Sequence, residues 1–366
     1  MDRDGGFSNE RGVVLLATLS MMLALFVLVF EASRHARREL ATASSAFIVS
    51  ELRATAVSGV HVGMAFLAAD GKEGGTDTVQ ETWADEEALG TFISSLTFER
   101  GKLDLTLTDE LGKVQVNALV QYPDGKQFNP DQKALWDNFF DLVNKSNDDI
   151  ESLGENVGII NAMKDWLDYG DGDASTGLSG AEDDYYLNLE TPYPCGNGPL
   201  RHLYEMARIK GIDEELLTRE EAGYRLCDLL TVYGAESAQA KDDGETVRRF
   251  TYPGKVNINT AELPVLFALM PDTLSDMDKE MAATSMVEYR FDKGEEGFLH
   301  PLDGEWYNTC PGCENHGINK KMLRTDSTVF AIMSRAVDDG RYVEIHAVVR
   351  RDGEKLTVLS WQETGT

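Results

Sequence analysis

An uncharged apolar run near the amino end constrains this chain more than any other feature. The run, VVLLATLSMMLALFVLVF, extends from Val13 to Phe30. As a helix it would span roughly 27 Å at ~1.5 Å per residue, close to the hydrocarbon thickness of a bilayer. A helical pattern of apolar residues then continues to about Ala69. We therefore expect one helix over residues 13–69, longer than a soluble domain needs.

A short polar segment, residues 1–12, precedes the apolar run and ends in Glu10-Arg11-Gly12. Secretory signals are cleaved after their apolar stretch, at a small-residue motif that does not follow the run here. The sequence instead favours a cut before the run, between Gly12 and Val13. Such a cut leaves the apolar helix as the mature amino terminus, which is typical of type IV pilin-like proteins.

The charges around the run conflict with this topology. Four basic residues follow it (Arg34, His35, Arg37 and Arg38), so the positive-inside rule would place the body in the cytoplasm. We give precedence to the cleavage pattern, because these residues continue an amphipathic helix rather than form a loop. We expect the body to lie outside the cytoplasm.

The chain of 366 residues is strongly acidic, with a formal net charge of −29. This length suggests two or three domains. An anionic body repels nucleic acid and anionic lipid, and it favours cations or basic partners. High net charge also keeps a protein soluble, and part of the acidic surface has that simpler interpretation.

Changes of period along the chain predict its organisation. Residues 91–119 and the last forty residues alternate apolar and polar side chains, as strands do, and the block between them has helical spacing. We expect an α+β fold with a long amino-terminal helix, an antiparallel sheet and a large inserted α domain. Gly59 and Gly63 should soften the end of the helix, and the segment from Asp70 to Gly75 should break it. The predicted segments are a leader (1–12), the helix (13–69), a first β region (70–120), the α domain with two subdomains divided near residue 242 (121–325), and the last strands (326–366).

Four cysteines, Cys195, Cys227, Cys310 and Cys313, are compatible with two disulfides in an extracytoplasmic body. Sequence alone leaves three pairings open, of which we prefer Cys310–Cys313 with Cys195–Cys227. The CPGC string also fits half of a zinc site or a redox pair. A second CxxC is missing, which weighs against zinc.

An acidic, glycine-rich segment is the best candidate for metal chemistry. Its acids are Asp165, Asp168, Asp171, Asp173, Glu182, Asp183 and Asp184. These charges repel one another unless a cation neutralises them, and carboxylates on a flexible loop suit Ca²⁺. The spacing approaches an EF-hand loop, but Thr176 stands where the glycine belongs. We expect a structural Ca²⁺ held by Asp168, Asp171, Asp173, Glu182 and Asp183; the alternative is a plain solvated acidic loop.

Several strings resemble one family over most of the chain. They are RGVVLLATLSMML, TDELGKVQVNALV, DWLDYGDGDASTGLSGAEDDYY, TPYPCGNGPLRHLYEM, VNINTAELPVLFALMP, STVFAIMSRA and the closing VVRR and VLSW. The chain resembles the type II secretion system minor pseudopilin K family. The resemblance implies a pilin-like fold with an inserted α domain, calcium sites in that domain, and N-methylation of the mature chain. It also implies an inner-membrane anchor and a periplasmic body.

The resemblance further implies a tip position on the pseudopilus, in complex with other minor pseudopilins. The major pseudopilin, the inner-membrane assembly platform and the prepilin peptidase would be further partners, and nucleic acid would not. Major pilins carry a glutamate at the fifth mature position, thought to pair with the next subunit's amine, whereas Ala17 stands there in this chain. A terminal subunit does not need that carboxylate, since nothing is stacked above it.

Two other functions stay open. A minor pilin could prime a type IV pilus or a DNA-uptake filament, which an exposed basic patch near the tip would favour. A membrane-tethered periplasmic enzyme could use the acidic segment as a catalytic metal site. The six histidines show no zinc-protease spacing, and acidic pairs arise by chance in so acidic a chain. We therefore expect no enzymatic activity and assign no catalytic residue.

Overall fold

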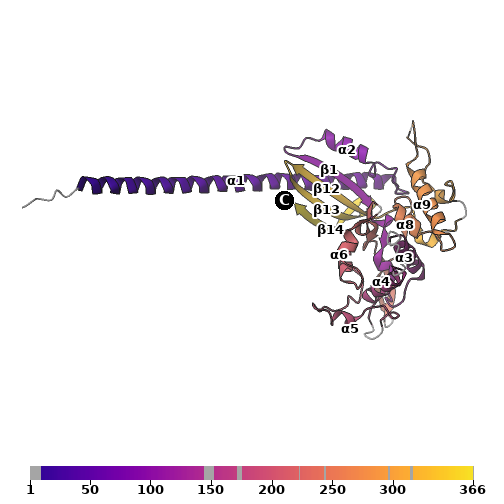
Figure 1. The fold of residues 1–366 in the computed structure, drawn as a ribbon. Helices are drawn as coiled ribbons and strands as arrows, with labels where there is room; N and C mark the ends of the chain where they lie inside the picture. The colour runs from indigo at the N-terminus through magenta and orange to yellow at the C-terminus, as the bar shows by residue number, and fades with distance from the viewer. Residues whose placement is uncertain are drawn as a thin grey trace, which may run out of the picture.

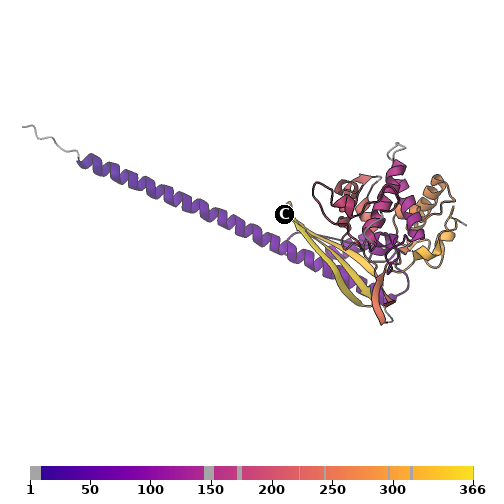
Figure 2. The same cartoon turned by 90° about the horizontal axis from the view of Figure 1, so that it is seen from below.

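The computed structural model describes residues 10–143, 152–170, 175–221, 223–242, 245–295, 297–313 and 316–365. Its longest element is α1 (Glu10–Glu73), a single helix of 64 residues. The amino-terminal part of α1 projects as a rod from the folded head in two perpendicular views (Figure 1, Figure 2). The large apolar side chains of Val13–Phe30 are exposed, and Gly12–Lys72 contains a window apolar enough to cross a membrane. The predicted long helix is therefore confirmed.

Four strands form an antiparallel sheet in the order β1-β12-β13-β14. Their bounds are Lys102–Asp109 for β1, Val329–Asp338 for β12, Arg341–Asp352 for β13 and Lys355–Gly365 for β14. The β12–β13 turn contains Asp339 and Gly340, both at positive φ, as tight hairpin turns require. The sheet thus joins a strand before the helical block to the three strands that the last forty residues predict.

The carboxyl-terminal part of α1 packs against one face of this sheet. The buried contact includes Leu52, Ala56, Val60 and Leu67 of α1 with Leu103, Leu105, Leu107, Phe330, Ile332, Val343, Ile345, Ala347 and Val349. A β-carbon at Gly59 would lie 2.2 Å from Ser334 Oγ, and one at Gly63 would lie 2.9 Å from a side-chain carbon of Ile332. Helix α1 is continuous through both glycines. They let the helix approach the sheet closely.

Helix α1 continues past the predicted end at Ala69 and stops at Glu73, within the segment 70–75 that the sequence predicts to break it. Asp70 forms an ion pair with Arg351 at the end of β13. A β-carbon at Gly71 would lie 2.6 Å from a backbone oxygen in the β13–β14 turn. The sheet therefore holds this last turn in place, and Gly74 follows the helix in the left-handed conformation, with φ of +62°.

Helices between β1 and β12 form a second core, which Figure 1 shows beyond one end of the sheet. Their bounds are α3 Pro130–Val143, α4 Ser152–Leu167, α5 Asp183–Tyr186, α6 Glu214–Thr218, α7 Leu226–Leu229, α8 Leu263–Ala268 and α9 Asp276–Phe291. Trp136, Phe139 and Phe140 of α3 are buried there with Met163 of α4 and Phe267 of α8. The predicted large helical insertion is confirmed.

The region before the insertion contains less β structure than the alternation predicts. Glu86–Ser95 is a helix, α2, whose first turn is capped by the Asp85 side chain accepting hydrogen bonds from the amides of Glu87 and Ala88. Strand β2 comprises only Val114–Gln115, and Val116–Leu119 forms a 3₁₀ turn. The capped helix α2 therefore occupies the first residues of the segment predicted to alternate.

The insertion also contains short strands that helical spacing did not predict. LLTREEAGYRLCDLL is divided at Gly223, where φ of +86° reverses the chain between β3 and β4. Strands β6 and β7 pair with each other across the division predicted near residue 242. The short strands are β3 Glu220–Glu221, β4 Tyr224–Arg225, β5 Leu230–Thr231, β6 Glu236–Asp242, β7 Glu245–Thr251, β8 Val256–Asn257, β9 Lys293–Gly294, β10 Gly297–Phe298 and β11 Leu323–Arg324. The domain boundaries remain predictions.

Candidate functional site

The end of α4 brings two carboxylates into the interior of the insertion. Asp165 lies in the last turn of α4, and Asp168 directly follows the helix. The spacing of three residues places both side chains on the same side of the helix. Both are buried, as is Glu182, which precedes α5. One carboxylate oxygen from each of the three residues lies within 4.8 Å of the others, so the acidic segment forms a compact group, which we call the buried acid group.

Asp165 also fixes the backbone of the segment that carries Glu182. Its Oδ2 accepts hydrogen bonds from the amides of Thr176 and Ala181, both at 2.9 Å. Between these amides, a β-carbon at Gly180 would lie 2.1 Å from the same oxygen. The segment therefore folds back onto α4 only because a glycine stands at position 180.

Lys164 forms ion pairs with two members of the buried acid group. Its Nζ donates a hydrogen bond to Asp168 Oδ2 and lies 3.8 Å from Asp165 Oδ1. The Lys164 ammonium thus lies beside two of the three carboxylates. Burial, followed by the charges of Asp165 and Asp168, raises the pKa of Glu182 to about 7, against the lowering effects of Cys195 and Lys164. Glu182 is therefore partly protonated near neutral pH.

The donor set suits a hard divalent cation. Three buried carboxylates offer oxygen ligands, and the Lys164 ammonium compensates one of their charges. Ca²⁺ prefers such ligands, whereas the Cys195 thiol, whose pKa burial raises to about 12, is a poor ligand for softer metals. The residues present therefore fit Ca²⁺, which would be bound together with loss of the Glu182 proton.

The five predicted ligands differ in where the structure places them. Asp168 and Glu182 join the buried acid group, whereas Asp171 and Asp173 lie outside the described residues. Asp183 is exposed, and its Oδ1 accepts a hydrogen bond from the Cys195 amide at 2.7 Å. Sequence reasoning passed over Asp165 as a ligand; its spacing of three from Asp168 at the end of a helix was the available signal.

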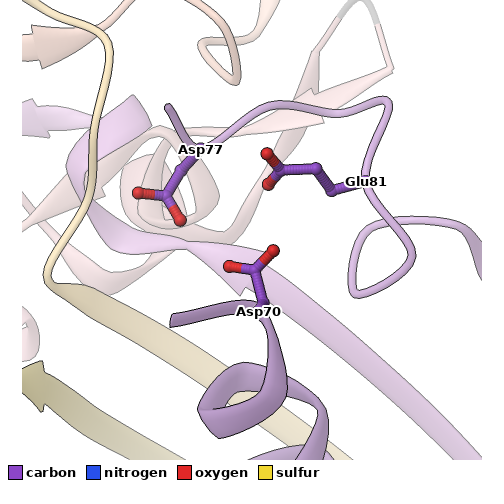
Figure 3. A group of neighbouring side chains, drawn as sticks. All are labelled: Asp70, Asp77 and Glu81. Carbon is purple, nitrogen blue, oxygen red and sulfur yellow. The ribbon is translucent and has the colours of Figure 1, made fainter. Parts of the chain in front are cut away.

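A second acidic group lies where α1 meets the insertion. Figure 3 shows Asp70, Asp77 and Glu81 turned toward one another, the first from the end of α1 and the others from the loop after it. Arg351 of β13 forms ion pairs with Asp70 and Asp77. Burial, followed by the charges of Asp70 and Asp77, raises the pKa of Glu81 to about 7, although Trp83 and Thr78 donate hydrogen bonds to it. The Arg351 guanidinium thus pairs with two of the three carboxylates in this group.

The same network ties the two cores together. The Asp77 carboxylate accepts a hydrogen bond from the Ser327 amide at 2.6 Å, and its backbone carbonyl accepts one from Asn257 Nδ2 at 3.0 Å. Asn257 belongs to β8 in the insertion, whereas Arg351 belongs to the sheet. The second acidic group is therefore a structural joint between the sheet and the insertion.

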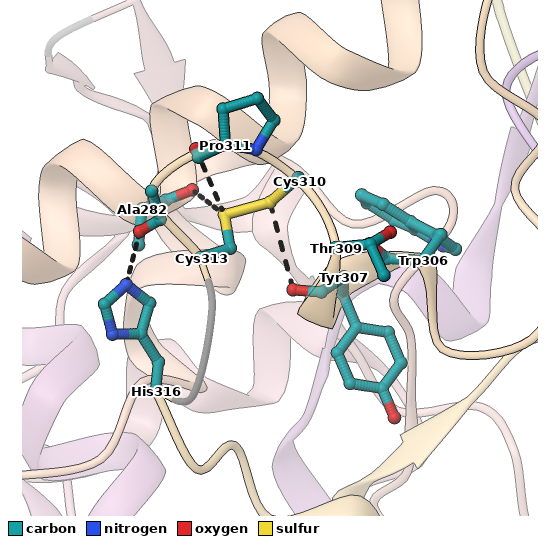
Figure 4. The surroundings of a disulfide bond; sticks show 9 residues. Ala282, Trp306, Tyr307, Thr309, Cys310, Pro311, Cys313 and His316 are labelled. Carbon is teal, nitrogen blue, oxygen red and sulfur yellow. Dashed lines mark hydrogen bonds between the residues drawn. A yellow bond between two sulfur atoms is a disulfide. The ribbon is translucent and has the colours of Figure 1, made fainter.

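The cysteines form one disulfide, between Cys310 and Cys313. Figure 4 shows it between Ala282 of α9 and the turn that contains Tyr307, and both cysteines are buried. The preferred Cys195–Cys227 pairing is wrong, since both residues are free. Cys195 is buried with its Sγ 3.6 Å from the Asp165 carbonyl oxygen, whereas Cys227 is half-buried with its Sγ 3.8 Å from the Asp228 carboxylate. Separate parts of the insertion hold the two thiols.

The predicted processing residues lie at the exposed end of the rod. Gly12 and Val13 are helical and exposed. The leader residues 1–9 lie outside the described residues. Cleavage between Gly12 and Val13 stays a prediction.

Comparisons with known proteins agree on one family. A family model described as "Type II secretion system (T2SS), protein K" matches residues 112–221, which include the buried acid group. The Type II secretion system protein K of Klebsiella pneumoniae is 23% identical over 216 residues, or 58% of this chain. The match spans 61% of that relative's length.

A solved structure shares the fold. It is a chain in the crystal structure of the GspK-GspI-GspJ complex from the enterotoxigenic Escherichia coli type 2 secretion system. The two chains superpose with a TM-score of 0.60 and 18% sequence identity, covering 88% of this chain and 99% of the other. The likeness confirms the predicted α+β architecture.

Proposed function

Since residues 112–221 belong to the protein K family of the type II secretion system, we propose that this chain is a minor pseudopilin of such a system. It takes part in protein export as a structural subunit of the pseudopilus, with no catalytic role. Before assembly it is anchored in the inner membrane by α1, with its body in the periplasm.

The exposed apolar part of α1 is the observation that carries this proposal. A contiguous apolar surface of that size is not stable in water, so it needs lipid or other apolar helices around it. The head is built on the other end of the same helix (Figure 1). A helix with an apolar part at one end and a folded head at the other can move from a bilayer into a bundle of similar helices without refolding.

We place the subunit at the tip of the filament. Ala17 supplies no carboxylate for pairing with a neighbour's amine within the apolar stretch. The insertion adds bulk at the end of the head away from the rod, where a further subunit would have to stack (Figure 2). Its tip partners would be other minor pseudopilins, as in the similar GspK-GspI-GspJ complex, and its further partners the major pseudopilin, the assembly platform and the prepilin peptidase.

We further propose a structural Ca²⁺ at the buried acid group. Asp165, Asp168 and Glu182 would hold it, and Asp171 and Asp173 remain predicted ligands from the same segment. The ion would neutralise the excess carboxylates and fix the segment against α4. Its role is to hold the insertion in shape at the calcium levels found outside the cytoplasm.

Mass spectrometry of the chain purified from membranes tests the anchoring arrangement. We expect a mature amino terminus at Val13, N-methylated, and an uncut chain when Gly12 is replaced by arginine. An intact Met1 in the natural chain, or a start after residue 30, would contradict the proposal. Electron microscopy with a label on the head tests the position, because a tip subunit appears once, at one end of each filament. Labels repeated along the shaft would contradict it.

The two alternative functions predict different results. A DNA-uptake pilin would bind DNA through its head, against the charge of −29. A metal-dependent enzyme would show turnover that requires Mn²⁺ or Mg²⁺, which the proposed calcium site does not. Filter binding with DNA and hydrolase assays with each metal distinguish these outcomes.

A further inference from the structure

Helix α9 has one face exposed to solvent, and neither of its two basic residues lies on that face. The helix contains two basic residues, Lys279 and Arg290, and both are buried. Lys279 Nζ donates a hydrogen bond to Asn138 Oδ1 at 2.6 Å. Arg290 donates to the carbonyl oxygens of Ile258 and Ala261, at 3.2 and 2.8 Å. The cations of α9 thus stabilise the interior and leave its outer face without positive charge.

The outer face of α9 combines apolar and acidic side chains. Met277, Met281 and Phe291 are 73%, 63% and 51% exposed, respectively. At ~100° per residue these three lie within about 80° of arc on the helix, and Glu280 and Glu288 lie within or beside that arc. Both glutamates are exposed. Met277 and Met281 lie one helical turn apart, and Phe291 lies roughly 15 Å further along the axis. Exposed apolar side chains on one side of a helix, rimmed by polar residues, are typical of an interaction surface.

This face lies at the end of the molecule away from the rod. Figure 1 shows α9 beyond the sheet, on the opposite side of the head from the projecting part of α1. Neither α1 nor the sheet covers it, and assembly of neighbouring rods around α1 would leave it accessible. A partner that approaches the head from outside therefore meets this face.

We propose that the outer face of α9 docks a cationic amphipathic segment of a partner protein. Met277 and Met281 would pack against the partner's apolar side chains, because flexible thioethers adapt to different shapes. Glu280 and Glu288 would attract its lysines or arginines. The glutamates would favour a basic helix, because complementary charges select partners at protein interfaces. The methionines would contact the apolar face of that helix.

Charge argues against the other occupants. A second copy of this chain would bring the same glutamates against Glu280 and Glu288, and the whole chain carries −29. Anionic lipid would meet the same repulsion. The proposal rests on this face alone and goes beyond the role in secretion, so its failure would leave that role intact.

A binding titration with the full chain tests the proposal. The chain is placed in phosphatidylcholine nanodiscs, and the probe is a fluorescent model peptide of leucine and lysine at helical spacing. Anisotropy is read after subtraction of empty nanodiscs. We expect binding that weakens with salt, and no binding of a matched leucine–glutamate peptide. Failure of the leucine–lysine peptide to bind would overturn the proposal.

Substitutions on α9 distinguish binding of the peptide at its outer face from general electrostatic attraction between the peptide and the acidic chain. Met277→Gln with Met281→Gln keeps the charge, and we expect it to raise the dissociation constant at least about tenfold. Glu280→Lys with Glu288→Lys should weaken binding and flatten its salt dependence. The matched control is Leu187→Gln with Glu236→Lys, which changes an exposed apolar residue and an exposed acid elsewhere and should leave binding unchanged.

Three results would overturn the proposal. The methionine double variant could bind the peptide as tightly as the natural chain, which would leave only general attraction to the acidic body. The control pair could weaken binding as much as the methionine pair. Sedimentation could show that the natural chain self-associates and that the methionine variant does not, which would make a second copy the occupant. Unchanged melting of the exposed-residue variants confirms that folding is not the cause.

Discussion

A β-carbon at Gly180 would lie 2.1 Å from Oδ2 of Asp165, the oxygen that accepts the amide of Ala181. Because the backbone of Gly180 can approach Asp165 closely, the segment that carries Glu182 folds back against α4, the helix that contains Asp165. The buried acid group therefore depends on a residue that has no charge.

Gly180→Ala tests this dependence. The added methyl group must displace Asp165 or the Thr176 backbone, so we expect a loss of about 1–3 kcal/mol in the free energy of unfolding and weaker calcium binding. Gly90→Ala is the matched control, because it lies within α2 with open space around it and should gain up to ~1 kcal/mol. Denaturant unfolding with and without calcium measures both. Equal effects of the two substitutions would contradict the packing argument.

The raised pKa of Glu182 predicts how stability changes with pH. Folding raises this pKa from its ordinary value of 4.5 to about 7, so between these values the folded state binds more protons than the unfolded state. Stability without metal should therefore fall as pH rises through that window. Calcium binds the ionised carboxylates, so its stabilising effect should be larger at about pH 8 than at about pH 5.5.

Thermal unfolding of the full chain in detergent, with calcium or chelator, measures this linkage. Glu182→Gln should reduce the pH dependence between these two values and weaken the response to calcium. A melting temperature that does not respond to millimolar calcium at either pH would remove the metal from the account. A response in Glu182→Gln equal to that of the natural chain would move the site to other acids.

Arg351→Met should destabilise the joint between the sheet and the insertion. It leaves Asp70 and Asp77 without the cation they share, and loss of one partner in a buried ion pair costs about 3–5 kcal/mol. Arg53→Met is the control: its pair with Glu363 is largely exposed and should contribute less than about 1 kcal/mol. Urea unfolding compares the two. Similar losses would show that the joint does not depend on Arg351.

The free thiols should differ in reactivity. Burial raises the pKa of Cys195 to about 12 and also raises that of Cys227, which is only half-buried. On alkylation of the folded chain without reductant, we expect Cys227 to react first, Cys195 after unfolding, and Cys310 and Cys313 only after reduction. Peptide mass spectrometry assigns each site. A peptide that links Cys195 to Cys227 would instead restore the pairing preferred from sequence.

The main helices and strands could be predicted from the spacing of apolar residues, because each of these elements depends on residues that are close together in the sequence. The run over Val13–Phe30 and the helical spacing after it predicted α1, and period-two alternation predicted β12, β13 and β14. The spacing of apolar residues gave the wrong element where a helix cap or a tight turn determined the local structure. Helix α2, capped by Asp85, extends into the start of the segment that alternates, and Gly223 divides a segment with helical spacing.

The sequence by itself determined the rod, the main strands, the helical insertion and the acidic character of the segment after α4. Only the tertiary structure decided which acids meet, because a carboxylate's neighbours are set by how the chain folds back. Asp165 lies 16 residues from the amide of Ala181 that it binds, and Arg351 lies 274 residues from Asp77. Contacts over such separations leave no periodic trace, so the choice between a cation site and an ion-paired joint required the fold.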